Sequence, residues 1–342
     1  MTGTRLRVLR ASEIEALLDL LDGWPFPDGQ SGRDFFRRYI ELDPAFEPRN
    51  VWVAEQGGEL VSCVQIFPRR VRVGGHVLPM GGIGSVFTRP DSRRRGVAGA
   101  LLERTIEAMR ERGMVLSFLL AERLKWYGLY DYRPWSRGWR TLHWPATHES
   151  PVAGVRRYAP TTDRGDLRRL WRTYAEGAGG RPLDGIVHRS SSEDWRGSFR
   201  LAGTPDEDIW IADDGSRRAA YLRVADFSGR LRVLEWGRER DAAPALCELV
   251  RTAMAGRRVE SIRLPLIRDE VLEWAFVAAG ARIETQPAWD ELPPDARPPA
   301  TWMVRCLDDG ALTGQLGLAG GGDLLARFLP PERFAFWEAD RF

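Results

Sequence analysis

Residues 86–99 read Val86-Phe87-Thr88-Arg89-Pro90-Asp91-Ser92-Arg93-Arg94-Arg95-Gly96-Val97-Ala98-Gly99, the most informative stretch of the sequence. A strand pattern runs into an arginine-rich turn, and the apolar positions that follow Gly96 have the spacing of a helix as far as Arg112. The first turn of a helix leaves backbone N–H groups unpaired and carries partial positive charge. Small residues let a phosphate approach these groups closely. The stretch therefore predicts an anion site between a strand and a helix.

The spacing of this loop points to one family. Arg93-x-x-Gly96-x-Ala98, directly after a strand, resembles the Q/R-x-x-G-x-G/A signature with which GNAT superfamily N-acetyltransferases hold the pyrophosphate of coenzyme A. The resemblance implies acetyl-CoA as co-substrate. It also implies a mixed α+β fold, with a central, mostly antiparallel sheet flanked by helices. The cofactor-binding residues that it implies are Val86, Phe87, Thr88, Arg93, Arg94, Arg95, Gly96, Val97, Ala98 and Gly99.

A second informative stretch, Trp126-Tyr127-Gly128-Leu129-Tyr130-Asp131-Tyr132-Arg133-Pro134, offers three tyrosines. Acetyl transfer must return a proton to the departing thiolate, and a phenol of pKa about 10 can protonate a thiolate whose thiol has a pKa of about 8.5. The stretch resembles the I-Y-G-R-F-G-Y-G-P segment of the enhanced-intracellular-survival (Eis-like) acetyltransferases. The general acid of that family matches Tyr127, while Tyr130 and Tyr132 match packing aromatics.

Two candidates for the general base stay open. In the Eis-like family the C-terminal carboxylate, carried by a phenylalanine, is the base, and this chain ends in Phe342. Glu122, at the end of the strand predicted over Met114–Leu120, is the rival. Family members also carry a sterol-carrier-like C-terminal domain, for which too few residues remain after Trp289. This departure leaves the family's hexameric assembly in doubt and a homo-oligomer open.

The chain repeats itself. Val51–Glu55 and the strand Leu60–Phe67 reappear as Ile209–Asp213 and the strand Ala219–Val224, which predicts two GNAT folds in tandem. We expect a catalytic domain at 1–150, a degenerate GNAT-like domain at 151–290, and a linker and tail at 291–342 that docks toward the active site. The second copy has no cofactor loop, because acidic residues stand between Trp236 and Pro244 where a pyrophosphate would bind.

Composition excludes several other classes. The 50 lysines and arginines are balanced by 48 acidic residues, which argues against nucleic acid as a partner. No apolar run is long enough to span a bilayer, and no signal peptide is apparent. The three scattered cysteines and four histidines lack the spacing of metal ligands, which predicts no metal. The scattered cysteines also suit the cytoplasm.

The sequence therefore predicts an enzyme, an acetyl-CoA-dependent N-acetyltransferase acting on a primary amine of a small molecule. An aminoglycoside-like or polyamine-like amine is the expected acceptor. A protein or peptide N-acetyltransferase, a non-catalytic acyl-CoA-binding sensor, and a transferase of another acyl group are the alternatives. Aromatic residues of the first two helical segments either line a substrate pocket or belong to the core. They are Trp24, Phe26, Phe35, Phe36 and Tyr39.

Overall fold

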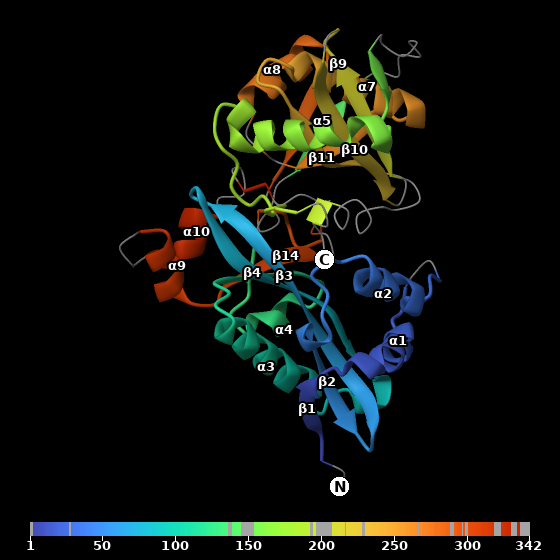
Figure 1. Ribbon diagram of the computed structural model, residues 1–342, viewed down its shortest axis with the longest axis vertical. Coiled ribbons are helices and arrows are strands. Elements are labelled where there is room, and N and C mark those ends of the chain that lie inside the picture. The colour runs from blue at the N-terminus through green and yellow to red at the C-terminus, as the bar shows by residue number, and fades with distance from the viewer. Residues whose placement is uncertain are drawn as a thin grey trace.

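The computed structural model contains two seven-stranded sheets with helices packed on them, arranged one above the other in Figure 1. This is the mixed α+β architecture that the sequence predicts. The residues described are 3–26, 29–135, 139–144, 154–191, 194–195, 207–215, 217–227, 230–265, 267, 269–287, 291–295, 297, 300–317, 323–329 and 334–335.

The first sheet has the strand order β1-β2-β3-β4-β5-β14-β6. Its strands are β1 (Arg5–Val8), β2 (Val51–Gln56), β3 (Glu59–Val73), β4 (His76–Thr88), β5 (Leu116–Ala121), β6 (Arg133–Pro134) and β14 (Thr301–Cys306). Neighbours are antiparallel except β4 and β5, which are parallel.

Helices cover both faces of the first sheet (Figure 1). On one face lie α3 (Val97–Glu111) and α4 (Leu124–Gly128), and on the other α1 (Ile14–Asp22) and α2 (Gly32–Glu41). Because successive strand residues point to opposite faces, Trp52 and Ala54 join the core under α3, whereas Val51 and Val53 join the core under α1. Helix α3 is the helix predicted after the arginine-rich loop, and Gly113, with φ +70°, follows its end.

The second sheet has the order β13-β7-β12-β11-β10-β9-β8. Its strands are β7 (Trp139–His143), β8 (Val155–Arg157), β9 (Asp208–Asp213), β10 (Arg218–Phe227), β11 (Arg230–Arg238), β12 (Ser261–Pro265) and β13 (Arg282–Gln286). Helices α5 (Pro160–Thr173), α7 (Ala243–Arg257) and α8 (Glu270–Ala278) pack around it, and a π-helical turn, Tyr174–Ala178, follows α5. From β8 to β13 this order repeats the first sheet, including one parallel pair, β11–β12. The strand order confirms the tandem fold.

Each sheet contains one strand from outside its predicted domain. Strand β7 lies within the predicted first domain but pairs with β12 and β13 of the second sheet. Strand β14 belongs to the predicted tail but lies between β5 and β6 of the first sheet. The predicted divisions at 150 and 290 therefore do not follow the sheets, because a strand pattern in a sequence does not identify the strand's partner.

Backbone hydrogen bonds also join the two units. The far end of the β3–β4 hairpin binds residues 184–188 of the second half, with the Arg72 N–H donating to the Ile186 carbonyl at 3.0 Å and the His188 N–H to the Arg70 carbonyl at 2.7 Å. In the tail, after α9 (Asp309–Gln315) and α10 (Leu324–Phe328), Phe334 is fully buried and stacks on Phe118 of β5 with ring centroids 5.7 Å apart. Phe334 thus belongs to a core cluster of the first unit, whereas the next residue, Ala335, joins the core of the second unit.

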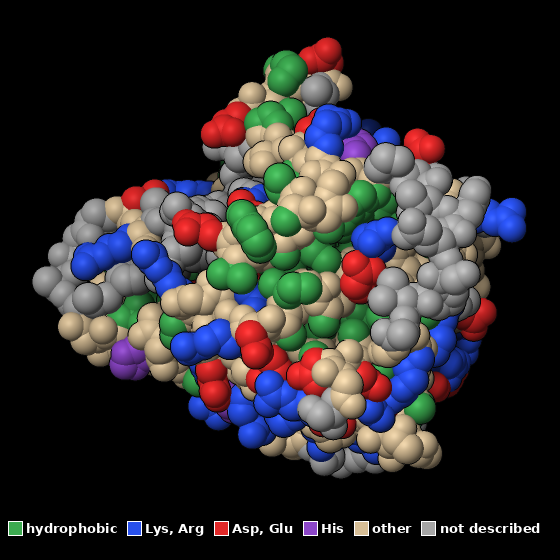
Figure 2. All heavy atoms as spheres, turned by 90° about the horizontal axis from the view of Figure 1, so that it is seen from above, with side chains coloured by type: hydrophobic (Ala, Val, Ile, Leu, Met, Phe, Trp, Pro, Cys, Tyr) green, Lys and Arg blue, Asp and Glu red, His purple; other side chains and the backbone are tan. Residues whose placement is uncertain are grey.

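The surface carries both signs of charge. Seen from above, arginine and acidic side chains are interspersed around a central hydrophobic area (Figure 2). None of the helices in the described part of the chain is long and apolar enough to cross a membrane.

Candidate active site

The site begins where β4 leaves β5. The two strands pair only over Met80–Ile83 and Leu116–Leu119, whereas β4 continues to Thr88. A bulge at Ser85, which has φ +51°, shifts the register between β3 and β4. The Ser85 hydroxyl donates to Gln65 Oε1 at 3.0 Å, and the Cys63 thiol donates to the Ser85 carbonyl at 3.1 Å. These buried bonds fix the bend that separates the two strands.

The start of α3 lies beside this separation. Gly96 is its N-cap with φ +78°, no side chain caps the helix there, and a Cβ at Gly96 would meet nothing within 4 Å. The arginines Arg94 and Arg95 are exposed. Arg93 is turned back, because its Nε donates to the Thr88 carbonyl at 2.8 Å and its guanidinium lies 5.6 Å from the Phe87 ring centre.

This geometry fits the pyrophosphate of coenzyme A. A helix start without a side-chain cap presents free N–H groups to an anion, and Arg94 and Arg95 add charge at the same end. Beyond the bulge, Val86, Phe87 and Thr88 form an extended segment that no longer pairs with β5. The predicted cofactor residues therefore lie together, with Arg93 alone directed toward the strand.

Tyr127 lies in α4, in the same apolar cluster as Ile83, Leu119 and Val97. Its side chain is 9% exposed, and within the described part of the chain no residue makes a hydrogen bond to its hydroxyl. Burial raises the pKa of Tyr127 well above its usual value. The tyrosine therefore lies next to the point where β4 and β5 separate, in its protonated form at neutral pH.

The other two tyrosines of the segment have different surroundings. The Tyr132 hydroxyl shares a buried hydrogen bond of 2.7 Å with Ser117 Oγ, as suits a packing residue. The Tyr130 hydroxyl reaches the cofactor loop, since a Cβ built on Gly99 would lie 2.4 Å from it. Sequence reasoning missed this contact, because nothing in the sequence links a glycine in the first turn of α3 to a tyrosine after α4.

The two candidate bases differ in what the structure shows of them. Glu122 follows β5 directly and is exposed. Phe342 lies outside the described residues.

Cys63 lies beside the bulge, where its thiol binds the Ser85 carbonyl. Burial raises the pKa of Cys63 to about 12, so its thiol stays protonated. No group of three or more histidine, cysteine, aspartate or glutamate side chains suited to a metal ion occurs in the described part of the chain.

In the second unit, a buried ion pair lies at the end of β11. Strands β11 and β12 pair only through Arg232 and Arg263. The fully buried Arg238, at the end of β11, donates to both oxygens of Asp269 at 3.0 and 2.9 Å. Asp269 also accepts from the Tyr174 hydroxyl at 3.0 Å and caps α8 through the Leu272 N–H. This ion pair joins the end of β11 to the start of α8.

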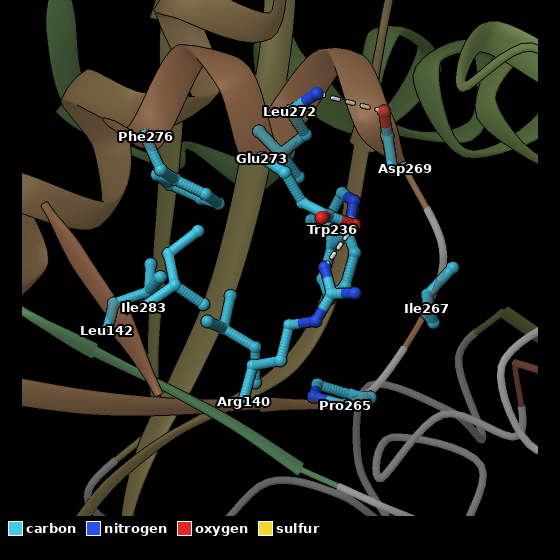
Figure 3. Close-up of a pocket in the computed structure, with 11 residues that line it drawn as sticks. Arg140, Leu142, Trp236, Pro265, Ile267, Asp269, Leu272, Glu273, Phe276 and Ile283 are labelled. Carbon is cyan, nitrogen blue, oxygen red and sulfur yellow. Dashed lines mark hydrogen bonds and ion pairs between the residues drawn. The ribbon is translucent and has the colours of Figure 1, made fainter. Parts of the chain in front are cut away.

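A small pocket lies beside this ion pair, between α8 and the second sheet (Figure 3). Its walls are mainly apolar, and Arg140 and Glu273 point toward each other across it as an ion pair. The apolar lining residues include Leu142, Leu264, Ile267, Leu272, Phe276 and Ile283.

Comparisons with known proteins agree with this geometry. Residues 5–135 match the family model described as an acetyltransferase (GNAT) domain. None of the curated proteins matches the sequence. Solved structures with the same fold include a GCN5-related N-acetyltransferase from Kribbella flavida, with a TM-score of 0.65 and 19% identity over 91% of this chain and 72% of that one.

Two further solved structures share the fold of this chain. Eis1 from Mycobacterium abscessus has a TM-score of 0.59 and 17% identity, covering 92% of this chain and 76% of its own. The N-myristoyltransferase of Saccharomyces cerevisiae with bound myristoyl-CoA has a TM-score of 0.53 and 11% identity, covering 84% and 80%. The chain therefore carries a GNAT acetyltransferase domain at residues 5–135, and its fold is shared with GNAT N-acetyltransferases of known structure.

Proposed function

We propose that the protein transfers the acetyl group of acetyl-CoA to a primary amine of a small molecule, by direct attack of the amine on the thioester. One observation carries the proposal: the uncapped start of α3 at Gly96 lies beside the point where β4 parts from β5. A pyrophosphate bound at Gly96 leaves the rest of the cofactor next to this gap.

The bound cofactor supplies an activated acyl thioester. The N–H groups of residues 96–99 and the guanidinium groups of Arg94 and Arg95 hold its pyrophosphate. The extended segment Val86–Thr88 orients the arm that carries the thioester. Positioning of this kind lowers the entropy cost of bringing amine and thioester together.

Tyr127 supplies the proton that the departing thiolate needs. Its raised pKa keeps the hydroxyl protonated at neutral pH, which is the state in which a general acid must start. The amine loses its own proton to a carboxylate, either the C-terminal carboxylate of Phe342 or that of Glu122. Two observations support these candidates. Glu122 follows β5 directly, and the tail that leads to Phe342 packs on the same strand, through Phe334 on Phe118.

An aminoglycoside-like or polyamine-like amine is the acceptor that the resemblance to the Eis-like enzymes implies, and Eis1 shares the fold. A protein or peptide acceptor and a non-catalytic acyl-CoA sensor are the alternatives. Transfer of a longer acyl group is a further alternative, because the N-myristoyltransferase with bound myristoyl-CoA has the same fold. The three free cysteines fit a cytoplasmic location.

Gly96→Glu tests the loop, because side chain and charge would enter the phosphate site. Gly113→Glu is the matched control: it also has positive φ with nothing within 4 Å of a Cβ, but lies at the other end of α3. We expect calorimetry to show no coenzyme A binding for Gly96→Glu and wild-type affinity for Gly113→Glu. Thiol release from acetyl-CoA with an amine panel should follow the same order. Equal binding by both variants would show that the cofactor lies elsewhere.

A further inference from the structure

Aromatic rings form a continuous row on the face of the first sheet opposite α3. They are contributed by α1, α2 and the loop between them and by the strands beneath, and neighbouring ring centres lie 4.8–6.3 Å apart. We call these seven residues the aromatic row: Phe67, Tyr39, Phe35, Phe26, Phe36, Trp24 and Phe87.

One end of the row reaches the active site. Phe87 lies beyond the Ser85 bulge, in the segment of β4 that has left β5. The loop after α1 rests directly on it, since a Cβ at Gly23 would meet Phe87 Cζ at 3.1 Å. Tyr127 and α3 occupy the opposite face of the sheet (Figure 1). An amine that attacks a thioester held between β4 and β5 therefore approaches from the side of the row.

The row is only partly a core feature. Phe36, Phe67 and Phe87 are buried, with exposures of 5%, 1% and 5%. Its other four rings, from Trp24, Phe26, Phe35 and Tyr39, remain partly exposed. Rings that remain partly exposed beside the proposed cofactor segment offer apolar surface to a ligand, which fully buried rings do not.

The charges around the row disfavour a ligand with several positive charges. An arginine lies against each end, with the Arg69 guanidinium 5.9 Å from the Phe67 ring centre and that of Arg93 5.6 Å from Phe87. Nearby carboxylates are engaged, because Asp43 accepts two bonds from Arg69, at 2.9 and 3.2 Å, and Asp22 accepts from Ser31 and from the Arg33 N–H. Asp34 lies in the first turn of α2, where its charge stabilises the helix start.

From this arrangement we infer that the acceptor is a monoamine with an apolar, preferably aromatic, body that lies against the aromatic row. The inference rests on the proposed function and restricts the class of acceptor amine. It favours a single positive charge over the polycationic amines that the resemblance implies. In the reaction, the amine nitrogen forms the bond to the acetyl carbon and the C–S bond breaks. Tyr127 protonates the sulfur, and the proton of the amine passes to the carboxylate base.

Matched amines test the inference on the unmodified protein. Hexylamine and 1,6-diaminohexane differ by one ammonium group, and 2-phenylethylamine adds a ring, while kanamycin represents a polycation. Because a second charge would have to be desolvated beside arginines, we expect kcat/KM for hexylamine to exceed that for 1,6-diaminohexane by at least about 10-fold. The ring of 2-phenylethylamine should raise kcat/KM further.

A pair of tryptophan variants locates the binding surface. Trp24→Ala should lower kcat/KM for 2-phenylethylamine by about 10-fold, mainly through KM, with unchanged coenzyme A affinity. Trp274→Ala is the control, since Trp274 of α8 is 72% exposed in the second unit. Thermal unfolding of both variants shows whether they remain folded, and the matched amines need no variant at all.

The outcomes separate the inference from the proposed function. A preference for 1,6-diaminohexane or kanamycin, or no acetylation of either monoamine by a protein that binds acetyl-CoA, would overturn the inference alone. Failure of the wild-type protein to bind acetyl-CoA would overturn the proposed function, and the inference with it.

Discussion

Gly99→Ala is the most informative single substitution, because its effect depends on one hydroxyl group. The new Cβ would lie 2.4 Å from the Tyr130 hydroxyl oxygen, about 1 Å inside van der Waals contact. Tyr130 cannot simply swing away, since its ring packs edge-on against Trp126 at 5.3 Å and its carbonyl accepts a bond from Arg305. The first turn of α3 or the tyrosine must move.

The expected magnitude follows from this geometry. Overpacking of a fixed neighbour costs about 1–3 kcal/mol. In a Tyr130→Phe background the nearest ring atom, Cζ, would be 3.6 Å from the Cβ, an ordinary contact. Gly99→Ala should then be neutral or stabilising by up to about 1 kcal/mol, because alanine is the better helix former. The coupling energy between the two positions should therefore be about 1–3 kcal/mol.

Four proteins complete the test: the wild type, each single variant and the double variant. Urea unfolding gives the free energies of unfolding, and calorimetry gives the coenzyme A dissociation constants. We expect Gly99→Ala alone to weaken coenzyme A binding by about 10-fold, with recovery in the double variant. Equal losses in both backgrounds would show that Tyr130 does not contact the loop, and the reasoning would be wrong.

Four further expectations concern the proton path and the second unit. Tyr127→Phe should leave coenzyme A binding intact while turnover falls by about 10²–10⁴-fold, and turnover within a few-fold of wild type would leave Tyr127 a packing residue. Burial raises the pKa of Tyr127 in the folded state above its value in the unfolded chain. The contribution of this difference to stability is fully present below about pH 10 and is lost as the pH rises toward the folded-state pKa. In urea unfolding above pH 10, the Tyr127→Phe variant should therefore lose less stability than the wild type. Deletion of Phe342, or one added glycine, should lower turnover sharply without affecting coenzyme A binding if the terminal carboxylate is the base, whereas a sensitivity of turnover to Glu122→Gln alone would assign the role to Glu122. Arg238→Met should destabilise the protein by about 3–5 kcal/mol, because it leaves Asp269 buried without its partner; a loss under 1 kcal/mol would mean that the ion pair does not hold the second unit closed.

The sequence predicts those parts of the site that lie close together along the chain. The strand, the loop at Arg93–Gly99 and helix α3 form one continuous segment, so spacing alone identifies them. The location of Tyr127 directly after β5 follows in the same way. Local pattern and helix-end chemistry are sufficient for these elements.

Long-range contacts were beyond the reach of the sequence. The Ser85 bulge depends on Gln65 and Cys63 in the neighbouring strand. The contact of Tyr130 with Gly99 depends on how α4 packs against α3. The partners of β7 and β14 depend on which sheet edge is open when the whole chain has folded. A single sequence contains no direct record of such pairings.

Strands β7 and β14 couple the folding of the two units. During synthesis the edge of β5 has no partner until β14 has been made, after the entire second unit. Until then Leu116–Ala121 presents an apolar, unpaired strand edge, which is a template for aggregation. The first unit thus reaches its final form only after the second unit has been made. Native-state hydrogen exchange should show the amides of β5 and β12 opening together, with similar free energies, rather than as two independent domains.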